Sequence, residues 1–260
     1  MKLFLAAALL FLVACGSEVK KEVVIKPGAY LMKSQSLKSS SLDTTYLELQ
    51  QLKIFTGEYM MYANFFARNS VSAFGIGSYS AEKDTVIEHV IYSAADSVKD
   101  DQPRNYRLTI LKEDSGYKQV IPDMESQGQK IILTEEYKTV GTAATTPLDG
   151  VWKESKTYYV KGKDTTKYNT NQYKAYFAGH YIWGNTFADS VKKTHTGMGF
   201  GKFEMKSPTK VTESCITSSY ATLRGKDIDI DIEMNGNDEY KQTINYPNNE
   251  KSVEIYSRIK

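Results

Sequence analysis

Two acidic residues inside apolar stretches are the side chains of this sequence with the clearest chemical potential. Glu88 ends a Val-Ile-Glu triplet and Glu213 ends a Val-Thr-Glu triplet, each within a run of strand-forming residues. A carboxylate enclosed by such strands must be hydrogen-bonded or carry a raised pKa, because burying it unpaired is costly. Either each glutamate anchors a ligand inside the fold, or it pairs with a lysine or tyrosine or faces solvent; the residue types leave both open.

Aromatic residues and a histidine form a second group of candidate ligand contacts. Tyr59 and Tyr62 flank two methionines, and Tyr176, His180 and Trp183 follow later in the chain. Aromatic and methionine-rich surfaces adapt to varied ligands, although the same residues also make plain core. Strand alternation predicts that His180 lies on the face opposite Trp183 and on the same face as Tyr176.

Other reactive arrangements are not found in the sequence. There is no Gly-x-Ser-x-Gly elbow and no phosphate-binding loop, and the three histidines and the cysteines lack the spacing of metal ligands. An enzyme would require Glu213 and His180 to meet in one pocket. Lys53 and Lys174 could meet a carboxylate ligand or lie at solvated strand ends. We therefore expect no catalytic activity, no cofactor and no metal.

The elements that must position these residues are duplicated. The triplet Asp-Thr-Thr at 43–45 recurs at 164–166, and further matches keep one order along the chain. The matched pairs include Tyr30 and Trp152, Gln51 and Gln172, Lys53 and Lys174, Phe55 and Tyr176, Tyr59 and His180, Tyr62 and Trp183, Asn64 and Asn185, Phe74 and Met198, Glu88 and Glu213, and Gln119 and Gln242. Chance does not produce such an ordered series, so the chain holds two copies of one unit.

Each copy is predicted to be a series of antiparallel strands. Residues Asp227 to Met234 alternate acidic and apolar side chains, and an Asn-Gly turn leads to a returning strand at Tyr240 to Tyr246. About eight such strands per copy fit an all-β, up-and-down barrel, because closure removes exposed edges; a sandwich is the alternative. Thr44–Leu52 is predicted to be one strand, and Ser34–Ser41 a mobile loop over the barrel mouth.

The N-terminus resembles a bacterial lipoprotein signal peptide. Lys2 precedes an apolar run, Leu3 to Val13, that is too short to span a bilayer. The run leads into Val-Ala-Cys-Gly, which resembles the lipobox, and that resemblance implies that Cys15 is lipidated and that the membrane is a partner. Gly16 directly after the cysteine favours the outer membrane of a Gram-negative envelope. An exported protein with an ordinary secretory signal is the alternative.

Composition and spacing set the domain plan. The net charge is +2 with acids and bases interspersed, so no basic stripe points to nucleic acid. Cys215 is the second of two cysteines, and with Cys15 lipidated no intramolecular disulfide can form. The plan is a signal peptide at 1–14, a lipidated cysteine and tether at 15–27, a barrel at 28–140, a polar linker at 141–149, and a second barrel at 150–260.

Both copies resemble the lipocalin-like, or calycin, domains of an exported bacterial lipoprotein family of largely unassigned function. The resemblance rests on a Gly-x-Trp motif ending at Trp152, on His-Tyr-Ile-Trp at 180–183 and on Gly-x-Gly-x-Phe at 199–203. The first copy departs from it, because Tyr30 replaces the tryptophan and Tyr59 replaces the histidine. The resemblance implies the barrel fold and gives Trp152 and Tyr30 the packing role of barrel plugs.

These features predict an envelope lipoprotein that binds, carries or sequesters a small apolar or amphipathic molecule, which is the default use of a barrel with a cavity. An eight-stranded barrel has room for either its own side chains or one small ligand. The alternative is an interaction or inhibitor module whose barrels are filled and whose partner is an envelope protein. Large side chains filling both interiors would favour that alternative.

Overall fold

The computed structural model describes residues 25–94, 104–126, 128–144 and 146–260. Two sheets of nine antiparallel strands each make up the fold. The predicted signal peptide, Cys15 and most of the tether lie outside the described residues.

The first sheet curls into a closed barrel, because β1 pairs with both β3 and β9. Eight strands form this barrel, and β2 is a short ninth strand that pairs with β1 alone. The strands are β1 (Gly28–Lys38), β2 (Asp43–Tyr46), β3 (Leu49–Phe55), β4 (Tyr59–Phe66), β5 (Val71–Glu82), β6 (Thr85–Ser93), β7 (Arg104–Glu113), β8 (Gly116–Ser126) and β9 (Gln129–Gly141).

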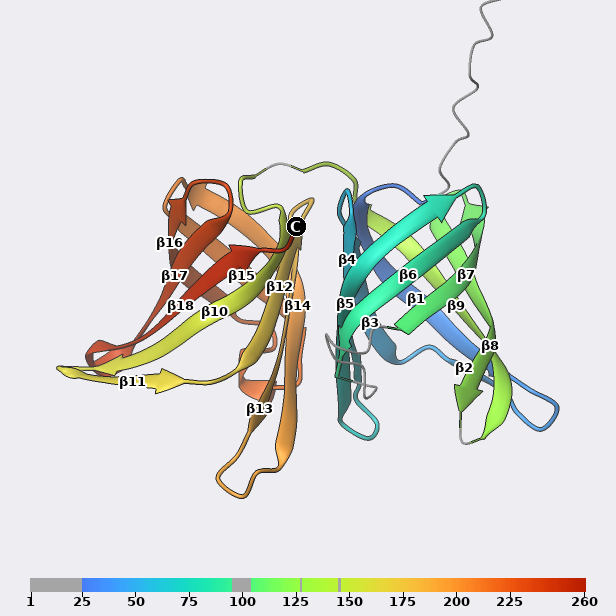
Figure 1. The fold of residues 1–260 in the computed structure, drawn as a ribbon, viewed down its shortest axis with the longest axis horizontal. Coiled ribbons are helices and arrows are strands. Elements are labelled where there is room, and N and C mark those ends of the chain that lie inside the picture. Colours follow the sequence, from blue (N-terminus) through green and yellow to red (C-terminus); the bar gives the residue numbers. More distant parts are fainter. Residues whose placement is uncertain (1–24, 95–103, 127, 145) are drawn as a thin grey trace, which may run out of the picture.

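The second sheet repeats this topology with β10 in the place of β1. Its strands are β10 (Gly150–Lys161), β11 (Asp164–Tyr168), β12 (Asn171–Phe177), β13 (His180–Ala188), β14 (Thr194–Ser207), β15 (Lys210–Ser218), β16 (Asp227–Asn235), β17 (Glu239–Tyr246) and β18 (Glu250–Arg258). Single-turn 3₁₀ helices lie at Ala221–Leu223 and Pro247–Asn249. The predicted all-β fold of two tandem eight-stranded barrels is confirmed (Figure 1).

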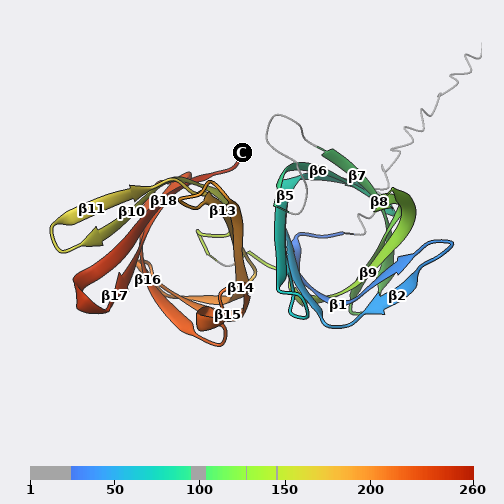
Figure 2. The ribbon, with the colours of Figure 1, turned by 90° about the horizontal axis from the view of Figure 1, so that it is seen from below.

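Two details of the first barrel differ from the sequence prediction. Residues Ser34–Lys38 belong to β1 rather than to a loop, because all five pair with β9 and Gln35–Lys38 also pair with β2. The predicted strand Thr44–Leu52 is interrupted at Leu47 and Glu48, where the chain leaves β2 and enters β3. The hairpins β1–β2 and β10–β11 therefore project from their barrels as flaps (Figure 2).

A buried aromatic side chain lies near one end of each barrel, at the start of its first strand. Trp152 is fully buried, and its Nε1–H donates to the carbonyl of Leu148 at 2.8 Å. Tyr30 is the matching residue of the first barrel, and its hydroxyl donates to the carbonyl of Lys26 at 2.7 Å. Both acceptors lie four residues upstream of the ring. We call this end the plugged end, and the opposite end, where the flaps project, the flap end.

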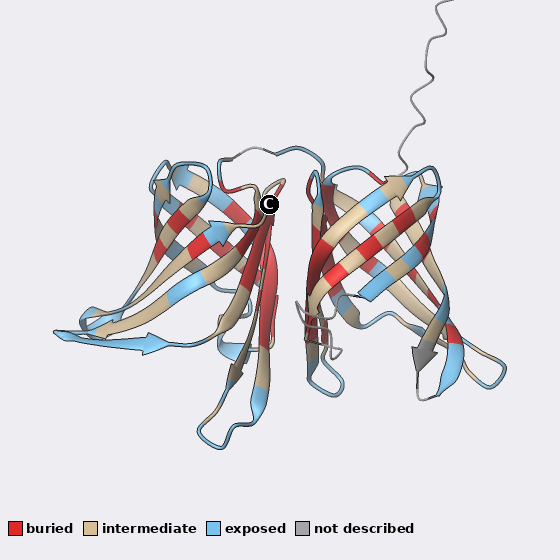
Figure 3. Ribbon diagram, viewed as in Figure 1, coloured by how far each residue is buried: buried red, intermediate tan, exposed pale blue. Residues whose placement is uncertain are grey.

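The two barrels pack against each other through matching walls. One buried apolar cluster joins strands β3, β4 and β5 to strands β12, β13 and β14, and these strands face each other between the barrels (Figure 3). Gly184 lies against the Phe74 ring, where a Cβ would overlap that ring. At the margin, the Tyr92 and Thr186 hydroxyls are 2.6 Å apart. The described parts of the barrels therefore share a buried cluster between them, in addition to the separate core cluster inside each barrel.

Candidate functional site

The interior of each barrel holds a buried lysine and a buried glutamate. Alternation along β12 turns Lys174 inward, and alternation along β15 does the same for Glu213. Their matches in the first barrel, Lys53 and Glu88, are equally buried. Both lysine–glutamate contacts are ion pairs. An unpaired charge buried in the barrel interior is energetically costly, so each lysine and its glutamate depend on each other as counter-charges.

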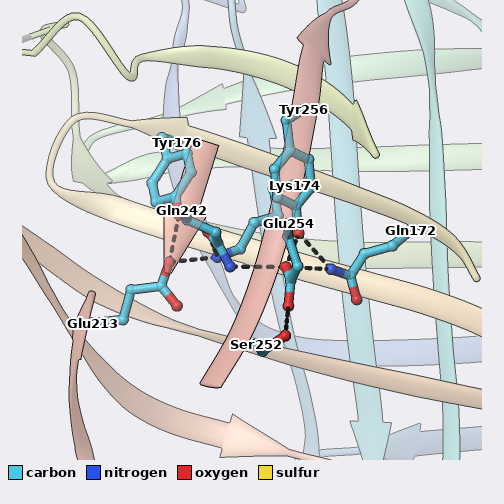
Figure 4. Close-up of polar contacts among 8 residues, drawn as sticks. All are labelled: Gln172, Lys174, Tyr176, Glu213, Gln242, Ser252, Glu254 and Tyr256. Atoms are coloured by element: carbon cyan, nitrogen blue, oxygen red, sulfur yellow. Dashed lines mark hydrogen bonds and ion pairs between the residues drawn. The ribbon is translucent and has the colours of Figure 1, made fainter. Parts of the chain in front are cut away.

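The second barrel extends this pair into a chain of hydrogen bonds (Figure 4). The Lys174 ammonium donates to Glu213 Oε1 at 2.7 Å and to Gln242 Oε1 at 3.1 Å. Gln242 Nε2 donates in turn to Glu254 Oε2 at 2.8 Å, and that oxygen also accepts from Gln172 Nε2 at 2.9 Å. The chain thus fixes side chains from four different strands.

The first barrel contains the same chain at matching positions. The Lys53 ammonium donates to Gln119 Oε1 at 3.2 Å, and Gln119 Nε2 donates to Glu135 Oε2 at 2.5 Å. The Tyr137 hydroxyl donates to the same oxygen at 2.8 Å, as Tyr256 does in the second barrel. We call these two sets the interior networks. They consist of Gln51, Lys53, Glu88, Gln119, Glu135 and Tyr137 in the first barrel, and of Gln172, Lys174, Glu213, Gln242, Glu254 and Tyr256 in the second.

The second barrel carries two polar groups that the first barrel lacks. The Tyr176 hydroxyl donates to Glu213 Oε1 at 2.5 Å, whereas the matching residue is Phe55. Burial, and then the negative charge of Glu213, hold the pKa of Tyr176 well above its usual value, so the hydroxyl remains a donor. Burial also raises the pKa of Glu154 to about 7, opposed by a hydrogen bond from Thr170.

The predicted ligand contacts fall into two groups. Tyr62 and Trp183 point into their barrels, where Trp183 stacks on Tyr220 with 5.8 Å between ring centroids. Tyr59 instead packs against the cluster between the barrels. His180 occupies the matching position, and its Nδ1 lies 2.9 Å from the Ala178 carbonyl oxygen.

The predicted face of His180 was wrong with respect to Tyr176. Tyr176 pairs directly with Tyr181 and packs in the interior, whereas His180 lies opposite Phe177 on the outer side of the wall. The reason is a two-residue turn at Ala178–Gly179, with positive φ at both positions, which reverses the chain between the two residues. Glu213 is inside the barrel, so His180 does not converge with it.

Two pairs of network residues, Glu135 with Glu254 and Tyr137 with Tyr256, were not identified from the sequence. Gln51 with Gln172 and Gln119 with Gln242 were recognised there only as matches of the repeat. A signal was available, because Glu-x-Tyr occurs at 135–137 and again at 254–256, in the last strand of each copy.

Among the described residues, one surface hollow of about 350 Å³ lies beside Thr170 and Phe187, and another of about 340 Å³ lies beside Lys210 and Asp231. Neither is lined by a residue of the interior networks. The same described ranges contain no group of three or more histidine, cysteine, aspartate or glutamate residues placed to hold a metal. Within them, too, no helix has the length and apolar character needed to cross a bilayer.

No family model and no curated protein matches this chain. Among solved structures, a protein of unknown function of the DUF3598 family from Nostoc punctiforme aligns with 90% of this chain and 96% of its own, at 10% identity and a TM-score of 0.27. The isotype 1 transferrin binding protein B from serogroup B Neisseria meningitidis aligns with 86% of this chain and 60% of its own, at 11% identity and a TM-score of 0.18. Superpositions this loose assign neither a family nor a function to the chain.

Proposed function

We propose that this protein is an interaction module of the bacterial cell envelope, in which two filled barrels form a rigid support for the docking of another envelope protein. The observation that carries the proposal is that buried side chains of the protein itself cross both interiors. A duplicated polar network crosses each barrel, and an aromatic plug lies above it. A carrier of small molecules would need that volume for its ligand.

The polar networks argue against a carrier more strongly than the plugs do. To admit an apolar ligand beside Lys174 and Glu213, the barrel would have to separate or expose an ion pair whose members are 4% and 5% exposed. Removing one buried charge from its partner typically costs about 3–5 kcal/mol. A ligand would have to offset that cost in each barrel before gaining affinity. Packed interiors of this kind favour a fixed shape over a binding cavity.

The membrane anchor belongs to the same proposal. Ile25, ten residues after Cys15, packs in the same buried cluster as Tyr30. A lipid on Cys15 would therefore attach through the plugged end of the first barrel, and the flap ends would face away from the bilayer. Metabolic labelling with a radioactive fatty acid tests this: the protein should incorporate label, and Cys15→Ser should not.

Native mass spectrometry of the purified protein tests the filled interior. We expect the mass of the polypeptide and its acyl chains with no further molecule, and no thermal shift with a panel of lipids, haem and sugars. Phe203→Ala is the positive control, since it removes a buried ring from the second interior and should create an apolar cavity that binds a small apolar probe. A molecule retained in equimolar amount by the unaltered protein would contradict the proposal and restore the carrier.

A further inference from the structure

The second barrel has a notch in its wall at the flap end. Strand β11 pairs only with β10, and β12 pairs with β13 no further than Asn171 and Thr186. Phe187 and Ala188 continue β13 beyond that point and pair on the β14 side only. A hollow of about 350 Å³ occupies this place, with Asn169, Thr170 and Asn171 on one wall and Thr186, Phe187 and Ala188 on the other.

The free edge of β11 offers backbone groups for pairing. The β10–β11 hairpin closes with a two-residue turn at Gly162 and Lys163, and Gly162 has a φ of 60°. In such a hairpin the closing residues, Lys161 and Asp164, are hydrogen-bonded to each other. Hydrogen-bonded pairs alternate along the ladder, so Thr165 and Lys167 direct their N–H and C=O groups away from β10. These are the groups that an added strand would use.

The flap and the β13–β14 loop, which border the notch, carry exposed lysines. Lys163 and Lys167 lie on the flap, and Lys192 and Lys193 lie on the β13–β14 loop; all four are exposed. Within the described part of the chain none of the four has an ion-pair partner, whereas the nearby Asp189 carboxylate is bonded to a histidine. Asp164 also lies exposed on the flap, but the four lysines outnumber it and Asp189, so the net charge is positive, which favours an acidic occupant.

The first barrel shows what closes a notch of this kind. Its flap residue Tyr46 contacts the Phe66 ring at 5.5 Å between centroids, which joins β2 to the end of β4. The residue that matches Tyr46 is Lys167, and the residue that matches Phe66 is Phe187. Phe187 stacks on His195 instead, at 5.4 Å. The first barrel thus has an aromatic contact across this position. The second barrel lacks it, because Lys167 stands where the first barrel has Tyr46.

We propose that the notch between β11 and the β13–β14 hairpin is a docking site for an extended acidic polypeptide segment, which pairs with the free edge of β11 as an added strand. Such strand addition takes its affinity from main-chain hydrogen bonds and its specificity from the side chains on either face. The inference rests on the proposed function as an interaction module and names its docking site and the chemistry of its partner.

The probe is a synthetic capped peptide in which glutamates alternate with valines, so that all glutamates share one face of a strand. Its binding to the full protein is followed by fluorescence anisotropy and by amide exchange. We expect the amides of Thr165 and Lys167 to become protected on binding. A peptide with lysine in place of glutamate should bind about tenfold or more weakly.

Three changes test separately how the edge hydrogen bonds, the open notch and the lysine charges contribute to binding. Thr165→Pro removes an edge donor without touching the β10 ladder, and should weaken binding about tenfold. Lys167→Tyr restores the aromatic contact of the first barrel and should weaken binding to a similar extent. Lys163→Glu combined with Lys192→Glu should weaken binding about tenfold and remove most of its salt dependence. The matched control is Lys130→Glu in the first barrel, which should leave binding unchanged.

Two outcomes would overturn the inference. If the charge reversals weaken binding while Thr165→Pro and the amide protection show no effect, the lysines attract polyanions without strand addition. If the peptide does not bind, the notch is not a docking site. Should Thr165→Pro fail to fold, amide protection in the unaltered protein still decides. The native mass measurement concerns the barrel interior alone, so the proposed function and this site can fail separately.

Discussion

Removing the negative charge of Glu213 from the interior should lower the free energy of unfolding of the second barrel by more than the loss of its hydrogen bonds alone would. Glu213→Gln keeps the shape of the side chain but leaves the Lys174 ammonium without a counter-charge. The lysine retains Gln242 as an acceptor at 3.1 Å and the face of Tyr176 at 5.2 Å. These contacts are worth about 1–2 kcal/mol against a typical cost of about 3–5 kcal/mol for breaking a buried pair. We expect a net loss of about 3 kcal/mol.

A second change should restore most of the lost stability. Adding Lys174→Met to Glu213→Gln removes the stranded charge, and the amide can still accept from the Tyr176 hydroxyl. The double variant should therefore be within about 1 kcal/mol of the unaltered protein. Its cost should be well below the summed costs of Glu213→Gln and Lys174→Met, because each single change leaves one buried charge without its partner. Glu204→Gln is the matched control, since its contact with Lys206 is exposed and should contribute less than about 0.5 kcal/mol.

Urea unfolding followed by tryptophan fluorescence measures these values, because the Trp152 ring lies 4.7 Å from Tyr240 inside the same barrel. The reasoning is refuted if Glu213→Gln costs no more than the exposed control. It is also refuted if the double variant is as unstable as the sum of the two single variants, because the lysine and the glutamate would then act independently.

Three further outcomes are expected. Burial raises the pKa of Glu154 to about 7 from 4.5, so between these pH values the folded state keeps a proton that the unfolded state has released, and stability should fall as the pH rises. In urea titrations, Glu154→Gln should remove about 1–2 kcal/mol of this fall, after allowance for the partial exposure of the side chain. Gly184→Asp places a charged side chain against Phe74, and should separate the barrels, seen as a larger radius of gyration in X-ray scattering with an unchanged strand signal in circular dichroism. Trp152→Phe deprives the Leu148 carbonyl of its donor and should cost about 1–2 kcal/mol in urea unfolding; no loss would mean that the plug acts through its ring alone.

Much of the fold could be predicted because the sequence shows both the alternation of polar and apolar residues along strands and the duplication of the unit. Asp227 to Met234 alternates without interruption and forms β16 over nearly the same residues. The pairing of Glu213 with a lysine or tyrosine was one of two open alternatives, and the geometry adopts it with both Lys174 and Tyr176. Barrel closure brings these residues together from strands far apart, which local patterns do not encode.

What could not be predicted depends on turns and on register. The turn at Ala178–Gly179 lacks the Asn-Gly or Asp-Gly signature of a two-residue hairpin, so alternation was carried across it and His180 was placed on the wrong face. The break between β11 and β12 was also not predictable, because no local sequence pattern marks where the chain leaves one strand and enters the next. Whether the predicted contacts bind a ligand stays a prediction.

The walls that join the barrels are copies of each other, and this has a consequence for how the chain arose. At their margin the Ser72 hydroxyl donates to the Thr196 carbonyl at 3.4 Å, and these two residues match in the repeat. A surface that fits its own duplicate is the kind through which identical subunits associate about a two-fold axis. Fusion of two such subunits replaces an encounter between molecules by one within a molecule, at an effective concentration set by the connecting segment. The two barrels then stay together however low the protein concentration becomes.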